Sequence, residues 1–267
     1  MTLHSVSAAG VRFVTLNDPA RRNALSESML ADFAVELGRI EQDEGCRALV
    51  LRGAGGVFCA GGDFTTFKAL METISTEGEA DPIARHNRAF GTLLTRFADL
   101  PVPTIAVVVG PAAGGGAGLA AVCDFVLAHT AATFATPETG LGIPPAQIAP
   151  FIAARIGRHA AARMLCDGRR LDSQEALRIG LVDAVADDTD AVLLETIRRL
   201  DRAEPTALRA TKRILAHGGA RDAQLDFAAQ CFARNLRTAA AEGIAAFAEK
   251  RAPAWQQSLA ALPEMPR

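Results

Sequence analysis

Residues 104–128 of the chain read TIAVVVGPAAGGGAGLAAVCDFVLA. Apolar runs at 104–109 and 125–128 flank a central stretch that is rich in glycine and carries one proline. No charged residue occurs from 100 to 123, which is long enough to span a bilayer, but the prolines and glycines would break a continuous helix. The stretch therefore predicts a buried strand, a turn, the start of a helix and a second strand.

The residues before this stretch alternate short apolar runs with helical periodicity. Val11–Leu16 is predicted as a strand that ends at the turn signal of 17–19, and 48–51 as a short buried strand. Between them, Ser26 is the expected N-cap of an amphipathic helix that runs to about Ile40. Strands that alternate with helices place the chain in the α/β class.

Two later regions have a different character. Residues 64–82 contain several acidic residues and little apolar periodicity, which predicts a mobile surface segment that could cover a binding site. From about Thr189 the pattern becomes helical, with one helix from Pro205 to the glycines at 218–219 and another after Asp222. The apolar residues expected on that last helix are Leu225, Phe232 and Leu236. We predict a core of residues 1–195 and a helical C-terminal region of residues 196–267.

Composition narrows the classes of function. Of the 267 residues, 49% are hydrophobic and 22% charged, which is typical of a soluble globular protein, and the net charge is −2. No block of like charges indicates a nucleic-acid tail or a polybasic membrane patch. The five scattered cysteines form no CxxC pair, and no HExxH motif occurs, so neither disulfides nor a zinc site are expected. The N-terminus lacks a signal-peptide pattern, so we expect a cytoplasmic protein.

Two glycine-rich turns follow strand-like runs. They are residues 58–63 (FCAGGD) and residues 110–119 (GPAAGGGAGL). Glycines let a ligand approach the backbone and let N–H groups converge on an anion, although either turn alone is equally typical of a simple tight turn. The phosphate-binding loop and dinucleotide-binding patterns are incomplete in both turns.

A single acidic residue stands out in the stretch that follows. Residues 136–145 read TPETGLGIPP, so Glu138 lies among apolar and helix-breaking residues. Desolvation at such a place would raise the pKa of the carboxyl group and suit it to proton transfer. Taken alone, the same pattern also fits a glutamate in a surface loop.

These features, in this order, resemble the enoyl-CoA hydratase/isomerase (crotonase) superfamily along the whole chain. The matching segments are 15–19 (TLNDP), 22–26 (RNALS), both glycine turns, 137–138 (PE), 170–173 (RLDS), 180–183 (GLVD) and 247–255 (FAEKRAPAW). The resemblance implies a spiral of strand–strand–helix units with a helical C-terminal oligomerisation region. It also implies an enzyme that acts on acyl-CoA thioesters and assembles as a trimer or a dimer of trimers, with no nucleic-acid or membrane partner.

The resemblance also implies roles for individual residues. The N–H groups of Gly62 and Gly115 match the oxyanion hole that holds the thioester oxygen of the enolate, and Glu138 matches the catalytic carboxylate. Gly115 would lie at a helix start, where the helix dipole adds to the field. The residues that match the CoA-binding surface are Arg22, Ala24, Ala60 and Gly61. No metal or redox cofactor is implied, because coenzyme A arrives as part of the substrate.

One position departs from the pattern of ordinary hydratases. They carry a second glutamate where this chain has Gly118, so the two-glutamate mechanism cannot operate unchanged. A narrower resemblance, to hydratases of isohexenylglutaconyl-CoA and methylglutaconyl-CoA, rests on 87–90 (NRAF), 114–119 (GGGAGL) and 145–151 (PAQIAPF). In those enzymes the same glycine accompanies a substrate that bears an extra carboxylate. A glycine would remove a repelling charge and leave room for that group.

These observations predict a lyase that adds water across the C2=C3 bond of a branched, carboxylated enoyl-CoA. Gln147 could position the water through its amide, or serve only to cap a turn. Arg88 and His86 could face the substrate carboxylate, or lie on a solvated helix face. Two alternatives remain at this point: an enoyl-CoA isomerase that uses the single Glu138, and a non-catalytic member that binds acyl-CoA.

Overall fold

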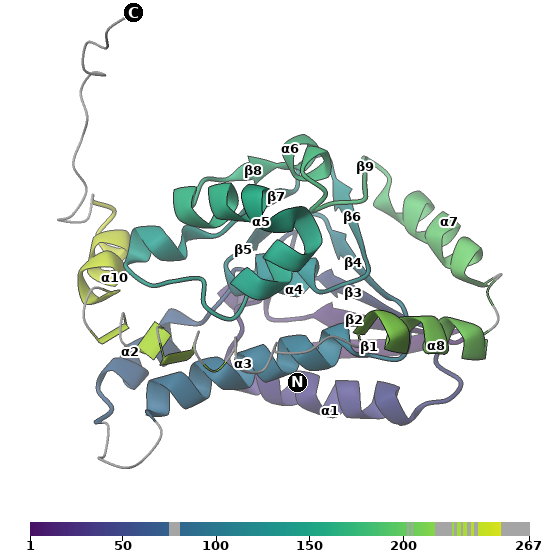
Figure 1. Cartoon of the computed structure of the whole chain (residues 1–267), viewed down its shortest axis with the longest axis horizontal. Helices are drawn as coiled ribbons and strands as arrows, with labels where there is room; N and C mark the ends of the chain where they lie inside the picture. Colours follow the sequence, from purple (N-terminus) through teal and green to yellow (C-terminus); the bar gives the residue numbers. More distant parts are fainter. Residues whose placement is uncertain are drawn as a thin grey trace, which may run out of the picture.

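The computed structural model describes residues 1–267 apart from 75–80, 202, 204, 217–225, 227–228, 231, 234–235, 238–239 and 252–267. A 6-stranded sheet in the order β1-β2-β3-β4-β6-β9 forms the centre, and a 3-stranded sheet in the order β5-β7-β8 adjoins it (Figure 1). The strands are β1 (Leu3–Ala8), β2 (Val11–Leu16), β3 (Ala48–Gly53), β4 (Thr104–Val108), β5 (Pro111–Ala113), β6 (Phe125–His129), β7 (Thr133–Ala135), β8 (Leu171–Asp172) and β9 (Ala184–Ala186).

Helices cover both faces of the sheets (Figure 1). The α-helices are α1 (Glu27–Gln42), α2 (Phe64–Met71), α3 (Pro82–Ala98), α4 (Gly115–Ala121), α5 (Ala149–Asp167), α6 (Ser173–Arg178), α7 (Thr189–Asp201), α8 (Pro205–Ala216) and α10 (Ala240–Ala248). Two 3-10 helices are η1 (Pro19–Arg21) and η2 (Pro137–Leu141). The strands and helices alternate along the chain in a crotonase-type α/β fold, as the sequence predicts.

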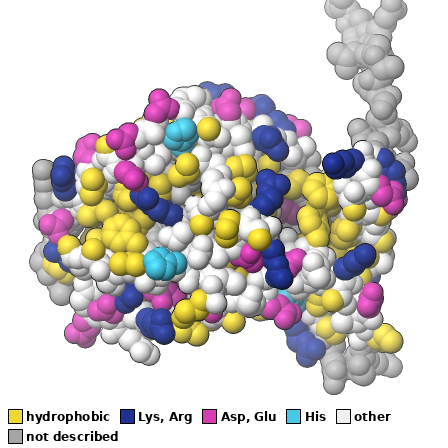
Figure 2. Space-filling view, turned by 180° about the vertical axis from the view of Figure 1, so that it is seen from behind, with side chains coloured by type: hydrophobic (Ala, Val, Ile, Leu, Met, Phe, Trp, Pro, Cys, Tyr) yellow, Lys and Arg dark blue, Asp and Glu magenta, His cyan; other side chains and the backbone are white. Residues whose placement is uncertain are grey.

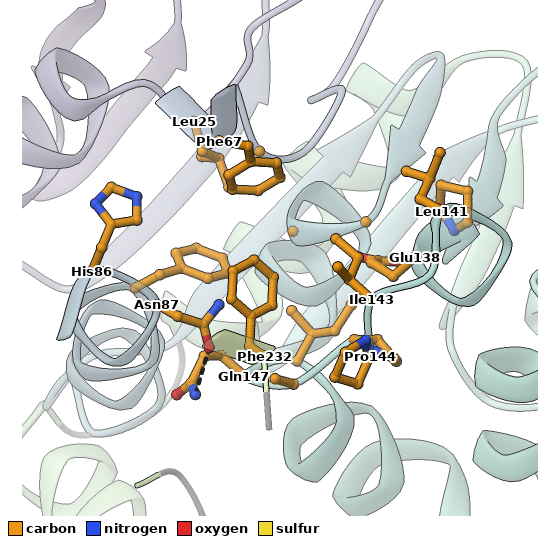
Figure 3. A pocket seen from close by; sticks show the side chains of 18 of the residues that line it. Leu25, Phe67, His86, Asn87, Glu138, Leu141, Ile143, Pro144, Gln147 and Phe232 are labelled. Carbon is orange, nitrogen blue, oxygen red and sulfur yellow. Dashed lines mark hydrogen bonds between the residues drawn. The ribbon is translucent and has the colours of Figure 1, made fainter. Parts of the chain in front are cut away.

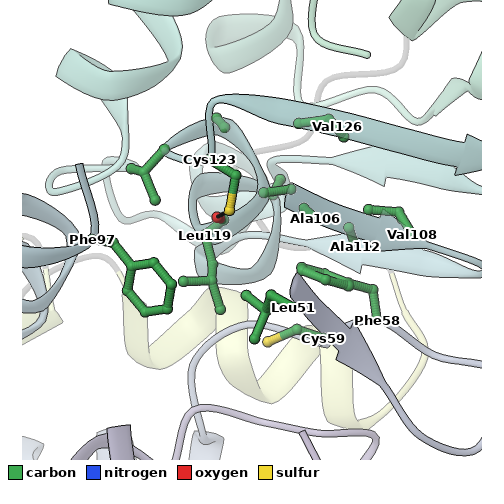
Figure 4. Packing of buried hydrophobic residues seen from close by; sticks show 14 of the residues in the cluster. Leu51, Phe58, Cys59, Phe97, Ala106, Val108, Ala112, Leu119, Cys123 and Val126 are labelled. Carbon is green, nitrogen blue, oxygen red and sulfur yellow. Dashed lines mark hydrogen bonds between the residues drawn. The ribbon is translucent and has the colours of Figure 1, made fainter. Parts of the chain in front are cut away.

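The stretch at 104–128 forms the middle of the core. Strand β4 is buried at every residue and pairs in parallel with both β3 and β6. The chain then turns through β5 into α4, and the side chains of this segment pack against Phe58 and Phe97 (Figure 4). A strand buried on both faces reads as a continuous apolar run, so the uncharged stretch is a core segment as predicted.

The predicted helix after Ser26 is confirmed. The Ser26 side chain accepts a hydrogen bond from the N–H of Met29, and the helix continues to Gln42. The helix predicted from Pro205 is also present, as α8, whereas Asp222 and Leu225 lie outside the described residues. Phe232 and Leu236 are buried in helical segments, in agreement with their expected apolar face.

The segment predicted at 64–82 as a mobile surface segment that could cover a site begins with a helix, which was not predicted. Residues Phe64–Met71 form helix α2, and the carboxylate of its N-cap, Asp63, accepts from the N–H of Thr65. No residue of α2 is buried, so it lies at the surface as predicted, and Phe64 and Phe67 line a pocket. The ring of Phe67 packs against that of Phe232, with centroids 5.7 Å apart. The stabilising partner is distant in the sequence, so the local pattern of 64–71 did not reveal the helix.

The C-terminal helices are joined closely to the core. The boundary predicted after residue 195 falls inside α7, which is one helix. In α8, the buried ammonium group of Lys212 lies 2.7 Å from a carboxylate oxygen of Asp124, which also accepts hydrogen bonds from the backbone and hydroxyl of Thr104. Asp124 therefore has a structural role, because it joins the start of β4 to α8.

In the part of the chain that the structure describes, no helix is long and apolar enough to cross a membrane. In the same part, no group of His, Cys, Asp and Glu residues could hold a metal ion. Cys46, Cys59, Cys123 and Cys166 are free thiols. On the face shown in Figure 2, positive and negative side chains are interspersed, so no extended basic patch covers that face.

Candidate active site

The two glycine-rich turns lie side by side. The N–H of Ala113 donates to the carbonyl of Cys59 at 2.9 Å, and Cys59 forms a parallel bridge with Ala112. Gly61 has a φ of +90°, and a Cβ there would lie 2.6 Å from the carbonyl oxygen of Ala113 and 3.2 Å from the amide nitrogen of Gly115. Only glycine allows this close approach, which brings the two turns together at one edge of the core.

The N–H groups of Gly62 and Gly115 are available at the floor of a pocket. Both residues line the pocket, and neither N–H donates a turn or loop hydrogen bond within the described chain. Gly115 is the first residue of α4. The N-cap of this helix is Gly114, which has no side chain that could accept a hydrogen bond from the first N–H groups of α4. An oxygen anion held at this place would be stabilised by two backbone donors and by the N-terminal dipole of α4.

Glu138 lies directly beside this floor. It is the second residue of η2, which begins with Pro137 and ends at Gly142 in the left-handed region. A Cβ on Gly114 would lie 2.8 Å from Oε1 of Glu138, so the carboxylate rests against the turn that carries Gly115. Oε2 is buried without a hydrogen-bond partner among the described residues, and desolvation raises the pKa of Glu138 to about 7. Such a carboxyl group can both accept and return a proton near neutral pH.

The raised pKa of Glu138 predicts a pH-dependent cost to stability. The folded state retains the proton up to about pH 7, whereas an ordinary glutamate has a pKa of 4.5. The stabilising contribution of the bound proton is therefore complete below about pH 4.5 and is lost as pH rises through 7. Glu138→Gln should therefore be more stable than the wild type by on the order of 1–3 kcal/mol at pH 8, and by less at pH 5. Urea unfolding at the two pH values measures this change. An equal difference at both would show that Glu138 is not desolvated in the folded protein.

The rest of the pocket wall is mainly apolar (Figure 3). The apolar side chains that line it are Leu25, Leu30, Phe64, Phe67, Phe90, Leu141, Ile143, Ile148 and Phe232. They come from α1 and the segment before it, α2, α3, η2 and the segment after it, and the C-terminal helical region, so residues far apart in the sequence form one wall. An apolar pocket with a few converging polar groups is the usual form of a small-molecule site.

The structure corrects the expectation that Gly118 leaves room for the substrate. A Cβ on Gly118 would lie 2.1 Å from Cγ2 of Ile148, so the side chain of Ile148 already fills that space. Gly118 is buried and does not line the pocket, whereas Ile148 does. The place that the resemblance gives to the hydratases' second glutamate is therefore taken by a hydrocarbon side chain, and Glu138 is the one acidic side chain among the lining residues that the structure describes.

The segment expected to bind CoA packs against the first glycine turn. The N–H of Ala60 donates to the carbonyl of Arg22, and the N–H of Leu25 donates to the carbonyl of Gly61. Ala60 lines the pocket, whereas Arg22 is exposed and Ala24 is buried, and neither of these two residues lines it. This placement keeps the predicted CoA-binding residues together beside Gly62, while the contact with CoA itself stays a prediction.

Asn23 has a role that the sequence did not reveal. It is fully buried in the left-handed region, with a φ of 56°. Its Nδ2 donates to the carbonyl oxygens of Ala54 and Val57, at 2.9 and 2.7 Å, and its Oδ1 accepts from the N–H of Asp18. Asn23 therefore fixes the segment around Arg22 to the loop that leads into the first glycine turn.

Polar side chains also occur on the opposite side of the pocket from Glu138 (Figure 3). His86, Asn87 and Gln147 line the pocket there, and Nε2 of Gln147 donates to Oδ1 of Asn87 at 2.9 Å. Gln147 is thus a buried pocket residue, but it is separated from Glu138. Arg88 points elsewhere, because its Nε lies 2.7 Å from the carboxylate of Asp226.

Comparison with known proteins identifies the family. Residues 7–258 match the sequence model of the protein family described as enoyl-CoA hydratase/isomerase. The chain belongs to the enoyl-CoA hydratase/isomerase family. An enoyl-CoA hydratase/isomerase from Marinobacter aquaeolei has 40% sequence identity and a TM-score of 0.78, and the match covers 95% of this chain and 98% of that one.

Two further members of the family support the same assignment. AtuE of Pseudomonas aeruginosa has 42% identity and a TM-score of 0.76, with 96% of this chain and 100% of that chain covered. The enoyl-CoA isomerase/hydratase fer4 of Mycosarcoma maydis is 34% identical, and the match covers 93% of both chains. The last name joins two reactions, so membership of the enoyl-CoA hydratase/isomerase family leaves the choice between hydration and isomerisation to the site itself.

Proposed function

We propose that this enzyme adds water across the C2=C3 bond of a branched, carboxylated enoyl-CoA thioester. The observation that carries the proposal is the position of Glu138, whose buried carboxylate lies against the turn that carries Gly115 and has a pKa of about 7. A thioester oxygen bound by the N–H groups of Gly62 and Gly115 would bring the adjacent carbons close to this carboxylate.

One carboxylate is enough for the chemistry. Ionised Glu138 removes a proton from a water molecule while the hydroxide forms a bond to C3 and the π electrons move onto the thioester oxygen. The two N–H groups stabilise the resulting enolate. Protonated Glu138 then gives the same proton to C2 as the enolate collapses, so the product contains one added water and the carboxylate is restored.

The absence of a second acid at the site supports a substrate that carries its own carboxylate. A second active-site carboxylate would repel such a group strongly in a pocket of low dielectric constant. Ile148 takes the place of that acid, and among the described lining residues only Glu138 is acidic. The resemblance of 87–90, 114–119 and 145–151 to hydratases of branched glutaconyl-CoA esters points to the same substrate class.

A second candidate function is isomerisation of the double bond. Ile148 offers no hydrogen bond to a water molecule beside Glu138, which favours direct proton transfer between carbons. In that reaction, Glu138 would remove a proton from C2 of a 3-enoyl-CoA, and the π electrons would shift to give a dienolate held by the two N–H groups. Glu138 would then return the proton to C4, so the double bond moves from C3=C4 to C2=C3. Both reactions use the same carboxylate and the same two N–H groups, so only the product distinguishes them.

A comparison of three substrates tests the proposal. We expect kcat/KM for hydration to be at least about tenfold higher for 3-methylglutaconyl-CoA than for crotonyl-CoA, the scale of one hydrogen bond to a charged group. Equal or better use of crotonyl-CoA would refute the carboxylated substrate. Rapid conversion of a 3-enoyl-CoA with no hydration would assign the enzyme to isomerisation, and binding of all three esters without turnover would indicate a non-catalytic member.

A further inference from the structure

The amide pair of Asn87 and Gln147 is built into the pocket wall. Gln147 is almost completely buried, and it lies so close to Gly91 of α3 that a Cβ there would be 1.9 Å from its Oε1. Its Nε2 donates to Oδ1 of Asn87 at 2.9 Å. Gly91 therefore makes space for Gln147, and Gln147 fixes the orientation of the Asn87 amide.

This orientation leaves a donor facing the pocket. Because Oδ1 of Asn87 accepts from Gln147, its Nδ2 group is turned away from that contact, and it has no partner among the described residues. Figure 3 shows the Asn87 nitrogen directed into the cavity, with His86 on the same helix. A donor in an apolar pocket is left unpaired at a cost unless a ligand supplies an acceptor.

The position of the pair indicates which part of a substrate it meets. Phe90, one turn further along α3, lies next to Gly115, since a Cβ on Gly115 would be 3.3 Å from its ring. The thioester end of a substrate therefore lies near Phe90, and Asn87 lies beyond it, on the side away from Glu138 (Figure 3). A polar group bound by Asn87 would belong to the far end of the acyl chain.

We infer that Asn87 is a specificity residue whose Nδ2 group donates a hydrogen bond to a carboxylate at the far end of the acyl chain, with Gln147 as its positioning residue. The inference rests on the proposed function, since it concerns the same pocket. A carboxylate forms stronger hydrogen bonds than a neutral acceptor. At this end of the pocket it is also separated from the negative charge of Glu138, so their mutual repulsion is reduced.

Saturated esters test this recognition without any reaction. The probes are 3-methylglutaryl-CoA, which carries the carboxylate, and 3-methylpentanoyl-CoA, which has a methyl group instead, and their Kd values are measured by calorimetry. The wild type should bind the first at least about tenfold more tightly. Asn87→Asp keeps an acceptor for Gln147 but replaces the donor by a negative charge. It should therefore weaken binding of 3-methylglutaryl-CoA about 30-fold or more, and binding of 3-methylpentanoyl-CoA less than about threefold.

Further variants separate recognition from folding. Ala89→Asp places the same charge on the exposed side of α3 and should leave both Kd values unchanged. Asn87→Leu removes the donor without adding charge and should weaken only the carboxylated ester, by about tenfold. Gln147→Leu should weaken binding of the carboxylated ester. Gln147→Glu should weaken it as well, because an ionised glutamate cannot donate a hydrogen bond to Oδ1 of Asn87. Equal losses for both esters in Asn87→Asp and Asn87→Leu, or a wild type without preference, would overturn the inference. Because no turnover is involved, failure of hydration would not affect this result.

Discussion

Replacing Glu138 by glutamine is expected to lower kcat by at least about 100-fold, the usual contribution of a general acid–base group, while binding of a saturated acyl-CoA stays within about threefold of the wild type. The amide has nearly the same shape, so it can remain against Gly114, but it cannot accept a proton from water or return one to C2. Among the described residues that line the pocket, Glu138 is the one acid, so none of them offers a carboxylate to replace it. Steady-state kinetics with 3-methylglutaconyl-CoA measures the loss.

A matched substitution and a pH profile complete this test. Glu195→Gln removes an exposed carboxylate on α7 and should leave kcat unchanged. In the wild type, kcat/KM should fall as pH drops below about 7, because Glu138 must be ionised to act as a base and burial raises its pKa to about 7. A variant Glu138→Gln that retains kcat within a few-fold would remove the carboxylate from the mechanism.

Replacing Gly115 by proline should reduce kcat by a further factor of about 10² to 10³ relative to Gly115→Ala, the contribution of one oxyanion donor. Gly115 is the first residue of α4, where proline is well tolerated because that N–H makes no helical hydrogen bond. Gly114, with φ 52° and ψ −122°, is outside the α region that a following proline disfavours. The substitution therefore deletes one N–H with little effect on the helix.

The alanine variant is the matched control for the added side chain. A Cβ at Gly115 would lie 2.8 Å from Cδ1 of Leu25 and 3.3 Å from the ring of Phe90, which are side-chain ends that can shift. We expect Gly115→Ala to retain activity within about tenfold of the wild type. Melting curves of the two variants would show whether both are folded. If folded Gly115→Pro and Gly115→Ala have equal rates, the N–H of Gly115 does not stabilise the enolate.

The local pattern of the sequence predicted those parts of the fold that local interactions determine. The strands at Val11–Leu16 and Thr104–Val108 are apolar runs bounded by turn residues, and the helix after Ser26 begins at a hydrogen-bonding cap. Helix α2 was missed, because its stabilising contact is the ring of Phe232, more than 160 positions away. Short-range periodicity carries no information on such a partner.

The candidate site divides in the same way. Gly62 and Gly115, which we propose as oxyanion donors, and Glu138 were found through their family resemblance, and the structure places all three residues in the wall of one pocket. The contact between Gly118 and Ile148 and the hydrogen bond between Asn87 and Gln147 were not predicted. Both join residues from separate helices or loops, and the space at Gly118 depends on the rotamer of a distant side chain.

The most direct test of the single-carboxylate mechanism is analysis of the product formed from 3-methylglutaconyl-CoA in D₂O that contains ¹⁸O-labelled water. The account predicts one ¹⁸O atom on C3 and one deuterium on C2 in the wild-type product, detected by mass spectrometry and NMR, and no labelled product above background with Glu138→Gln. A wild-type product that carries no ¹⁸O and has its double bond moved, with or without deuterium, would contradict hydration. Full labelling by Glu138→Gln at the wild-type rate would contradict the role of the carboxylate.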